Sequence, residues 1–369
     1  MIKYFGSGFL SVILGFFLGG NHFIYIYFIL LVFFILFIDR FNFIKPPFSF
    51  FLLFFSILVP GFVYFFISEF FFEHLIYFSL YIFCLVLCYF SFVKPYELFY
   101  STLGVSIGFC FLIIVLSIFS DNVVFSLILA SFDTNFVSLW LVFLIFVISK
   151  RFNFNSLYFY ISLAVVLYSG VMLESRSFLV LSLLVFLIHI FKNNFILAIL
   201  FVLIFIFSLF FLNIDFTFLY NYFYTLSSSF SGVYDVSHLN EDFRRVFLFT
   251  LGIESIVNNF PFGSGFGPKN YIFLVKGTSS IFSDHAALRL GYPHNYIISI
   301  ISQIGVLAIP WLLVIFSVCF RSFSSFSIIS ILFFALIFNE YIASPVIWVA
   351  IGLFFNFEFL RKFNAKSNY

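Results

Sequence analysis

Charged residues are scarce in this 369-residue chain, where only 9% of positions are charged and 64% are hydrophobic. A typical soluble domain carries about 25% charged residues and is about half apolar. The shortage of charge, with a mean hydropathy of +1.21, excludes an ordinary soluble domain. Long apolar runs recur from residue 5 to residue 359, and a transmembrane helix needs about 20 apolar residues. We therefore expect an all-α polytopic membrane protein whose residues 1–369 form a single integral membrane domain, with the lipid bilayer and not a nucleic acid as its surroundings.

Cysteine is also rare. The chain has four cysteines, all inside apolar runs: Cys84, Cys88, Cys110 and Cys319. Because none lies in the long polar stretch, we expect neither a disulfide framework nor a metal site, and no cofactor. Buried packing is the ordinary role of such residues. A cleavable signal peptide is not expected either, because a second hydrophobic run follows the first at once.

The apolar runs predict about twelve transmembrane helices. Their ranges are 5–20, 22–38, 48–67, 74–93, 98–119, 136–149, 156–173, 177–191, 195–212, 294–319, 326–338 and 345–359. Several are short for a full crossing, so tilting or local thinning of the bilayer must help. One large polar loop, residues 213–293, separates the ninth span from the tenth.

Charge predicts the orientation of these spans, because Lys and Arg are retained on the cytoplasmic side. With the N-terminus inside, eleven of the 17 basic residues fall inside: Lys3, Arg40, Lys45, Lys94, Lys150, Arg151, Lys192, Arg321, Arg361, Lys362 and Lys366. Of the 15 acidic residues, only Asp39, Glu97 and Glu358 fall on this side. We therefore expect both termini in the cytoplasm and the loop 213–293 outside.

Six basic residues fall outside against this preference. They are Arg176, Arg244, Arg245, Lys269, Lys276 and Arg289. An anionic ligand is one reason for such charges, and ordinary surface charge on a long loop is the other, since long loops escape the orientation rule. The second reason fits Lys269 and Lys276 best. Arg176 sits at a helix mouth with almost no loop around it, which favours a functional role.

The outer loop has internal order. Residues 241–260 carry apolar side chains at helical spacing, which predicts an amphipathic helix lying on or dipping into the membrane. Pro261 should end this helix. The glycine-rich turn GSGFGPKN (263–270) follows. Its spacing excludes a phosphate-binding P-loop, so it is either a tight turn that returns the chain or a backbone that lets a sugar or phosphate approach closely through Gly263, Gly265 and Gly267.

The polar residues of the outer face indicate a chemistry. Guanidinium groups of Arg176, Arg244, Arg245 and Arg289 can bind phosphate in a bidentate manner. His294 and Asn295 stand at the start of the next apolar run. An ordinary imidazole has a pKa of about 6.5, so His294 can accept a proton at neutral pH. The side chain of Asn295 can orient a hydroxyl or a sugar. Arginines without an acidic metal cage predict metal-free glycosyl transfer from a lipid diphosphate donor.

A plainer interpretation remains open for each histidine. A lone histidine at a helix start often caps the helix or lies at an interface, and this applies to His294. His285, in SDHAAL, is the best rival base. For the other four histidines the sequence favours only such plain roles: His22, His74, His189 and His238.

The stretch RRVFLFTLGIESIVNNFPFGSGFG, followed by PHNYIISIISQIGVLAIPW, resembles the shared region of the O-antigen ligase and O-antigen polymerase family. In that family an amphipathic helix leads to Pro-x-Gly-x-Gly-x-Gly, matched here from Pro261 onward. A His-Asn then opens a helix, with an acid-x-Gly further on, where Gln303 and Gly305 stand here. The segment SRSFLV resembles the family's Ser-Arg helix mouth. The match covers about a third of the chain, and the family's usual tryptophan after the loop arginine is absent.

The resemblance implies a metal-independent, GT-C-like membrane glycosyltransferase in a bacterial inner membrane, with its large loop in the periplasm. Its donor would be an undecaprenyl-diphosphate-linked oligosaccharide, its acceptor a glycan or lipid A-core, and a chain-length regulator a further partner. His294 would be the catalytic base, and Asn295, with the loop glycines, would orient substrate. Arg176, Arg245, Arg244 and Arg289 would hold the diphosphate, although Arg244 and Arg245 point about 100° apart on a helix.

Three functions stay open at this point. The first is a polymerase that extends a surface polysaccharide, which the short chain slightly favours. The second is a ligase that transfers finished glycan to lipid A-core or to another acceptor such as a protein. The third is a transporter or flippase of lipid-linked oligosaccharide, which the nearly charge-free spans disfavour, because transporters place polar groups near the bilayer midplane.

Overall fold

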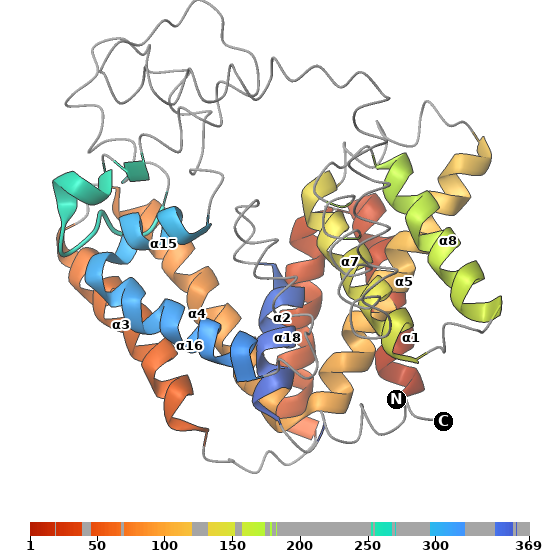
Figure 1. Ribbon diagram of the computed structural model, residues 1–369, viewed down its shortest axis with the longest axis horizontal. Helices are drawn as coiled ribbons and strands as arrows, with labels where there is room; N and C mark the ends of the chain where they lie inside the picture. Colours follow the sequence, from red (N-terminus) through yellow and green to blue (C-terminus); the bar gives the residue numbers. More distant parts are fainter. Residues whose placement is uncertain are drawn as a thin grey trace, which may run out of the picture.

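The computed structural model describes about half of the chain. These residues are 1–18, 20–38, 46–67, 70–119, 132–151, 157–173, 252–253, 255–267, 296–321 and 344–356, with the single positions 178, 182, 270 and 359. Every regular element within these ranges is helical (Figure 1). The elements are α1 (Ile2–Leu18), α2 (Asn21–Ile38), α3 (Phe48–Ile67), α4 (Phe71–Val93), α5 (Pro95–Phe119), α7 (Thr134–Arg151), α8 (Leu157–Met172), α15 (Tyr296–Ile304), η2 (Gly305–Leu307), α16 (Ala308–Arg321) and α18 (Pro345–Phe355).

Four helical stretches in the described ranges are long and apolar enough to cross a membrane. They are Phe48–Ile67, Phe71–Val93, Pro95–Ile118 and Ile297–Val314, and shorter apolar helices accompany them. The all-α class and the membrane character are thus supported, while the expected count of twelve spans is not confirmed. The spans expected over 195–212 and 326–338, all but two positions of the span 177–191 and most of the loop 213–293 lie outside the described residues.

The expected span 294–319 requires a correction. The sequence shows one unbroken apolar run there, but the structure divides it into α15, the short 3₁₀ turn η2 and α16. The division falls at Gly305, whose φ is +59°. A residue in this conformation cannot continue a right-handed helix.

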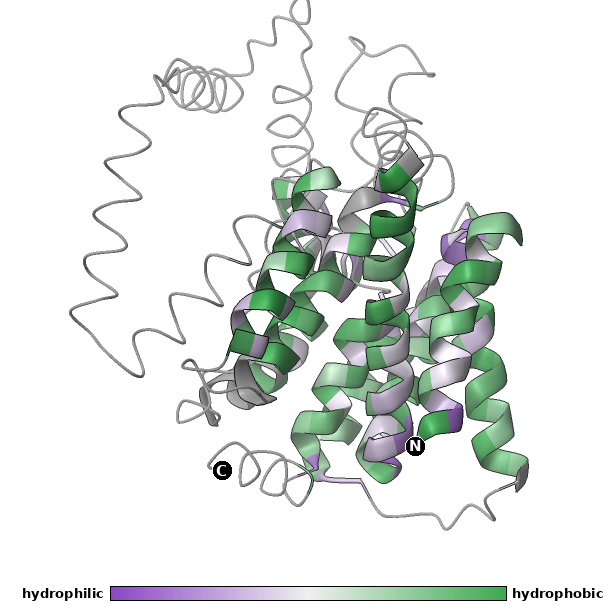
Figure 2. Ribbon diagram, turned by 90° about the vertical axis from the view of Figure 1, so that its right-hand side faces the viewer, coloured by the Kyte–Doolittle hydropathy of each residue, from purple (hydrophilic) through white to green (hydrophobic). Residues whose placement is uncertain are grey.

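The outward faces of α1, α2 and α3 are apolar. Large side chains there are more than half exposed, among them Phe17, Phe37, Phe55 and Phe66. Figure 2 shows the helices largely in green along their length, with hydrophilic positions few. An exposed surface of this kind suits lipid and not water, because large apolar patches are rare on soluble monomers.

Two groups of helices are joined by α18. At one end of the molecule α3, α4, α15 and α16 lie together, and at the other end α1, α5, α7 and α8 do (Figure 1). Helix α18 contacts α4, α5, α7 and α16. Every residue of α18 is buried, as are residues 136–148 of α7. Helices that are apolar on all sides and buried on all sides form the centre of a bundle.

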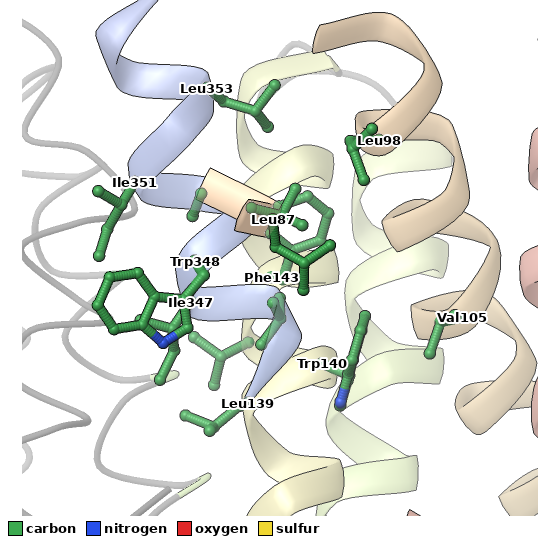
Figure 3. Packing of buried hydrophobic residues seen from close by; sticks show 14 of the residues in the cluster. Leu87, Leu98, Val105, Leu139, Trp140, Phe143, Ile347, Trp348, Ile351 and Leu353 are labelled. Atoms are coloured by element: carbon green, nitrogen blue, oxygen red, sulfur yellow. The ribbon is translucent and has the colours of Figure 1, made fainter. Parts of the chain in front are cut away.

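Large aromatic and aliphatic side chains fill this centre. Figure 3 shows side chains of α7, such as Trp140 and Phe143, and of α18, such as Ile347 and Trp348, in the same cluster. The rings of Trp348 and Trp311 lie 5.1 Å apart, which connects α18 to α16. At the end of α18, the side-chain amide of Asn356 donates to the carbonyl oxygen of Phe92 at 2.7 Å. The two helix groups are therefore held in one packed core.

Helices α1 and α5 pack backbone against backbone. A Cβ added at Gly8 would overlap the carbonyl oxygen of Ser101, and one added at Gly104 would overlap that of Phe5. At Gly108, an added Cβ would lie 3.1 Å from the carbonyl oxygen of Phe9. Small residues at such spacing let membrane helices approach closely, and packing then replaces the hydrophobic effect as the driving force.

This contact yields a test with a control on the same helix. Gly8→Ala should lower the free energy of unfolding by about 1–3 kcal/mol, because its methyl group meets fixed backbone. Gly6→Ala should be neutral or slightly stabilising, since a Cβ there meets nothing within 4 Å and Ala favours helix over Gly. Thermal unfolding of the purified protein in detergent measures both. Equal midpoints for the two variants would contradict the close α1–α5 contact.

Candidate functional site

The break between α15 and α16 is closed by the glycine loop, which we define as residues 261–267. In an unbroken helix the amide of Val306 would donate to the carbonyl oxygen of Ser302, four residues back. Here the Val306 amide donates to the carbonyl oxygen of Pro261 at 2.8 Å. The loop therefore supplies an acceptor at the point where the helix is interrupted.

The loop also supplies donors to the break. The amide of Ser264 donates to the carbonyl oxygen of Ser302 at 2.7 Å, and the amide of Gly265 donates to that of Gln303 at 2.9 Å. The Ser264 hydroxyl reaches the same Ser302 oxygen at 3.0 Å. Figure 1 shows this loop in teal beside α15. Residues almost 40 positions apart in the sequence thus form one hydrogen-bonded unit.

Helices α3 and α4 hold the other side of the loop. The Tyr64 hydroxyl of α3 donates to the carbonyl oxygen of Gly263. On α4, His74 is fully buried. The backbone amide of Phe266 donates to Nδ1 of His74 at 3.1 Å, and Nε2 of His74 lies 2.9 Å from the carbonyl oxygen of Gly61. The loop is therefore fixed to α3 and α4 as well as to α15.

These contacts define the form of the His74 ring. Because Nδ1 accepts a hydrogen bond from an N–H group, it carries no proton. Nε2 faces a carbonyl oxygen, so it carries the proton and donates. The imidazole in this arrangement is the neutral Nε2–H tautomer, with both ring nitrogens in use.

An aromatic anchor secures the same segment. The Phe266 ring is fully buried. Its centroid lies 4.8 Å from that of Tyr81, 5.5 Å from that of His74 and 5.9 Å from that of Phe78, all on α4. By contrast Val257, Phe260 and Phe262 are each about two-thirds exposed or more, as expected for an amphipathic segment whose apolar side faces the membrane.

The three loop glycines have left-handed backbone conformations. Their φ angles are +84° at Gly263, +87° at Gly265 and +109° at Gly267. A Cβ at Gly263 would lie 2.6 Å from the carbonyl oxygen of Gln303, and one at Gly265 would lie 3.0 Å from the ring of Tyr64. The glycines are thus required by both conformation and space.

The glycine loop uses its own amides within the protein. The amides of residues 262 and 263 donate to Asn259, and those of residues 264, 265 and 266 donate to Ser302, Gln303 and His74. Of the two interpretations of this turn, these bonds favour the tight turn over a cradle whose amides point at a ligand. Direct contact of Gly263, Gly265 and Gly267 with substrate stays a prediction.

Gln303 occupies the position where the resembled family has an acid. Its side chain is buried, and its amide nitrogen donates to the Ser299 hydroxyl at 2.9 Å. Its Oε1 has no hydrogen-bond partner within the described ranges. A neutral amide fits this apolar place, because an acid would bury a charge at high cost.

The polar residues expected to perform the chemistry lie outside the described residues. This holds for the catalytic candidate His294, for Asn295, for the rival base His285 and for four arginines: Arg176, Arg244, Arg245 and Arg289. Helix α15 begins at Tyr296, directly after His294 and Asn295. Tyr296 is six residues before Ser302, about 9 Å along a helix axis. The expected amphipathic helix is described only at residues 252–253 and 255–259, and it ends before Pro261 as predicted.

The sequence reading missed the roles of His74 and Tyr64. Both lie within expected spans, and His74 received only a plain role. A signal was present, because an ionisable residue in an apolar helix is a functional candidate by default. Arg176 at its helix mouth is one such residue, and His74 in the first turn of α4 is another.

Comparison of the chain with known proteins found no match by sequence or by structure. No protein-family model matches it, and no curated protein and no solved structure does either. Within the described ranges, no group of three or more His, Cys, Asp or Glu residues could hold a metal ion. Cys84, Cys88 and Cys110 are buried and form no disulfide, which agrees with the packing role expected for them.

Gly305 provides a test of the loop–helix contact. Gly305→Ala should release the glycine loop, because a Cβ there overlaps the carbonyl oxygen of Pro261 and Ala disfavours a positive φ. Gly305→Asn separates the two causes, since Asn tolerates this conformation but carries the same Cβ. We expect both variants to lower the unfolding midpoint in detergent to a similar extent. A wild-type midpoint for the Asn variant would show that no backbone lies against Gly305.

Proposed function

We propose that this protein is a membrane glycosyltransferase that polymerises a bacterial surface polysaccharide. The observation that carries the proposal is the joining of two separate motifs, the glycine loop and the Gln303–Gly305 break, by direct backbone hydrogen bonds. The resemblance rests on these same motifs in this order. Their contact supports the view that they belong to one site and are not chance matches in an apolar sequence.

In the proposed reaction a sugar hydroxyl of the acceptor attacks the anomeric carbon of the donor. The new glycosidic bond forms as the bond between that carbon and the diphosphate oxygen breaks. The hydroxyl proton passes to His294, which precedes α15 by two residues. The leaving group is undecaprenyl diphosphate, and Arg176 with Arg245, Arg244 or Arg289 would hold its charge in place of a metal.

The proposed location follows from charge. Both termini would lie in the cytoplasm of a bacterial inner membrane, and the loop 213–293 would lie in the periplasm. The donor would then approach from the outer leaflet, and Asn295 would orient the acceptor beside His294. A lipid bilayer, the lipid-linked donor, the acceptor glycan and a chain-length regulator are the proposed partners.

Deletion of the gene separates this function from its alternatives. Surface polysaccharide from the deletion strain, separated on a gel, should show core carrying a single repeat unit, because units are made and exported but not joined. Bare core with accumulated lipid-linked polymer would instead identify a ligase. Loss of all outward-facing lipid-linked units would identify a transporter, and an unchanged ladder would contradict the proposal.

His294 can be tested against its rival. In the complemented deletion strain, His294→Ala should reduce polymerisation by about 10²-fold or more, the usual contribution of a general base. His285→Ala should leave the ladder near normal. Both proteins should accumulate in the membrane to the wild-type amount, as measured by immunoblot. The opposite pattern would move the base to His285, and two normal ladders would end the role of either histidine as the base.

A further inference from the structure

His74 is a buried polar residue that the proposed reaction does not use. It lies in the first turn of α4, between α3 and the glycine loop, and none of its side chain is exposed. Its two ring nitrogens connect the carbonyl oxygen of Gly61 to the amide of Phe266. Leaving a polar group unpaired in such surroundings is costly, so both bonds have a strong reason to persist.

The surroundings of His74 keep its ring in one orientation. The Phe78 ring stacks on it at 6.1 Å with an interplanar angle of 14°, and the Phe266 ring covers it at 5.5 Å. Tyr64 lies at 6.2 Å and donates to the same loop through its hydroxyl. The ring therefore presents Nδ1 to the loop in a fixed direction.

The glycine loop connects His74 to α15. From Phe266, which His74 holds, two residues lead back to Ser264, whose amide and hydroxyl bond the carbonyl oxygen of Ser302. Ser302 lies in the last turn of α15, the nine-residue helix that begins two residues after His294. A short helix fixed at one end carries any displacement to the other end, and a shift of about 1 Å can cost about 10²-fold in rate.

We propose that His74 is a positioning residue, which holds the glycine loop against α15 and thereby sets the place of His294. This inference rests on the proposed function for its effect on the reaction. Its structural part, that His74 fastens the loop, stands on the contacts alone. His74 touches no reacting atom in this account, and its partner in the loop is the Phe266 amide.

Three substitutions separate the two bonds of His74. His74→Asn places an oxygen at the position of Nδ1 and can accept from the Phe266 amide. His74→Gln places its polar group at the position of Nε2 and can reach only the Gly61 side. His74→Phe keeps the ring and the stacking but removes both bonds. If the loop bond is the important one, Asn should behave like the wild type, and Gln should behave like Phe.

The position of the loop is measured by thiol labelling in membranes. In a full-length background with the four native cysteines replaced by alanine, Ser264→Cys reports on the loop, because Ser264 is only 4% exposed. Asn258→Cys is the control, because Asn258 is an exposed polar residue of the segment that leads into the loop. With a membrane-impermeant maleimide, position 258 should label quickly in every variant. Position 264 should label slowly with His or Asn at position 74 and at least about tenfold faster with Phe or Gln.

Activity is measured on the same variants without the reporter cysteine. The probe is the lipid-linked repeat unit isolated from the deletion strain, supplied to membranes with equal amounts of each protein. We expect kcat to fall about tenfold or more for Phe and Gln, with recovery in Asn and little change in KM. A defect in folding alone would lower the amount of protein and would not follow this order.

Each outcome of the labelling and activity experiments tests a different part of the proposal. Slow labelling at position 264 in both the Phe and Gln variants would overturn the role of His74 in fastening the loop. Fast labelling with an unchanged kcat would overturn the link from the loop to catalysis. If no variant and no wild-type protein extends the probe, while the labelling order holds, the proposed function fails and the structural role of His74 stands. If the Phe variant does not accumulate, the Asn–Gln contrast decides alone.

Discussion

Backbone polar groups in an apolar layer must find partners, and this constraint governs the region around Gly305. The stretch Ile297–Val314 is long and apolar enough to cross a membrane, yet it is interrupted in its middle. A broken helix leaves amides and carbonyl oxygens that lipid cannot satisfy, at a cost of several kcal/mol for each group. Irregular backbone is tolerated at such depth where other protein covers it. The glycine loop provides that cover with its own backbone.

Other features of the site follow from these backbone hydrogen bonds between the glycine loop and the helix break. The loop must approach closely enough to bond Ser302 and Gln303, which demands glycine at positions 263 and 305. Its far side must be fixed in turn, and Tyr64, His74 and the buried Phe266 ring do so. Helices α3, α4 and α15 thus become one unit with a segment from outside the bundle. Such a unit can hold a catalytic group at the start of α15 in a constant place.

The sequence predicted part of this arrangement. The apolar runs predicted α3 at 48–67, as observed, and the bounds of most other described helices to within a few residues. They did so because length and hydropathy decide where a membrane helix lies. The break at Gly305 was not predicted, because hydropathy carries no information on backbone conformation and the run stays apolar across the break. The roles of His74 and Tyr64 were missed as well, because their partners in the loop lie 192 and 199 positions away. The glycines at 263, 265 and 267 were identified by pattern, but their packing against Gln303, Tyr64 and Glu73 required three dimensions.

The most direct test of the central claim is an electron cryomicroscopy map of the full chain in a lipid nanodisc, at a resolution that shows backbone carbonyls. The account predicts an interrupted helix at residues 304–307. It also predicts the amides of Ser264 and Gly265 within hydrogen-bond distance of the carbonyl oxygens of Ser302 and Gln303, near the 2.7 Å and 2.9 Å found here. A continuous helix through Gly305, with the glycine loop away from it, would contradict the account.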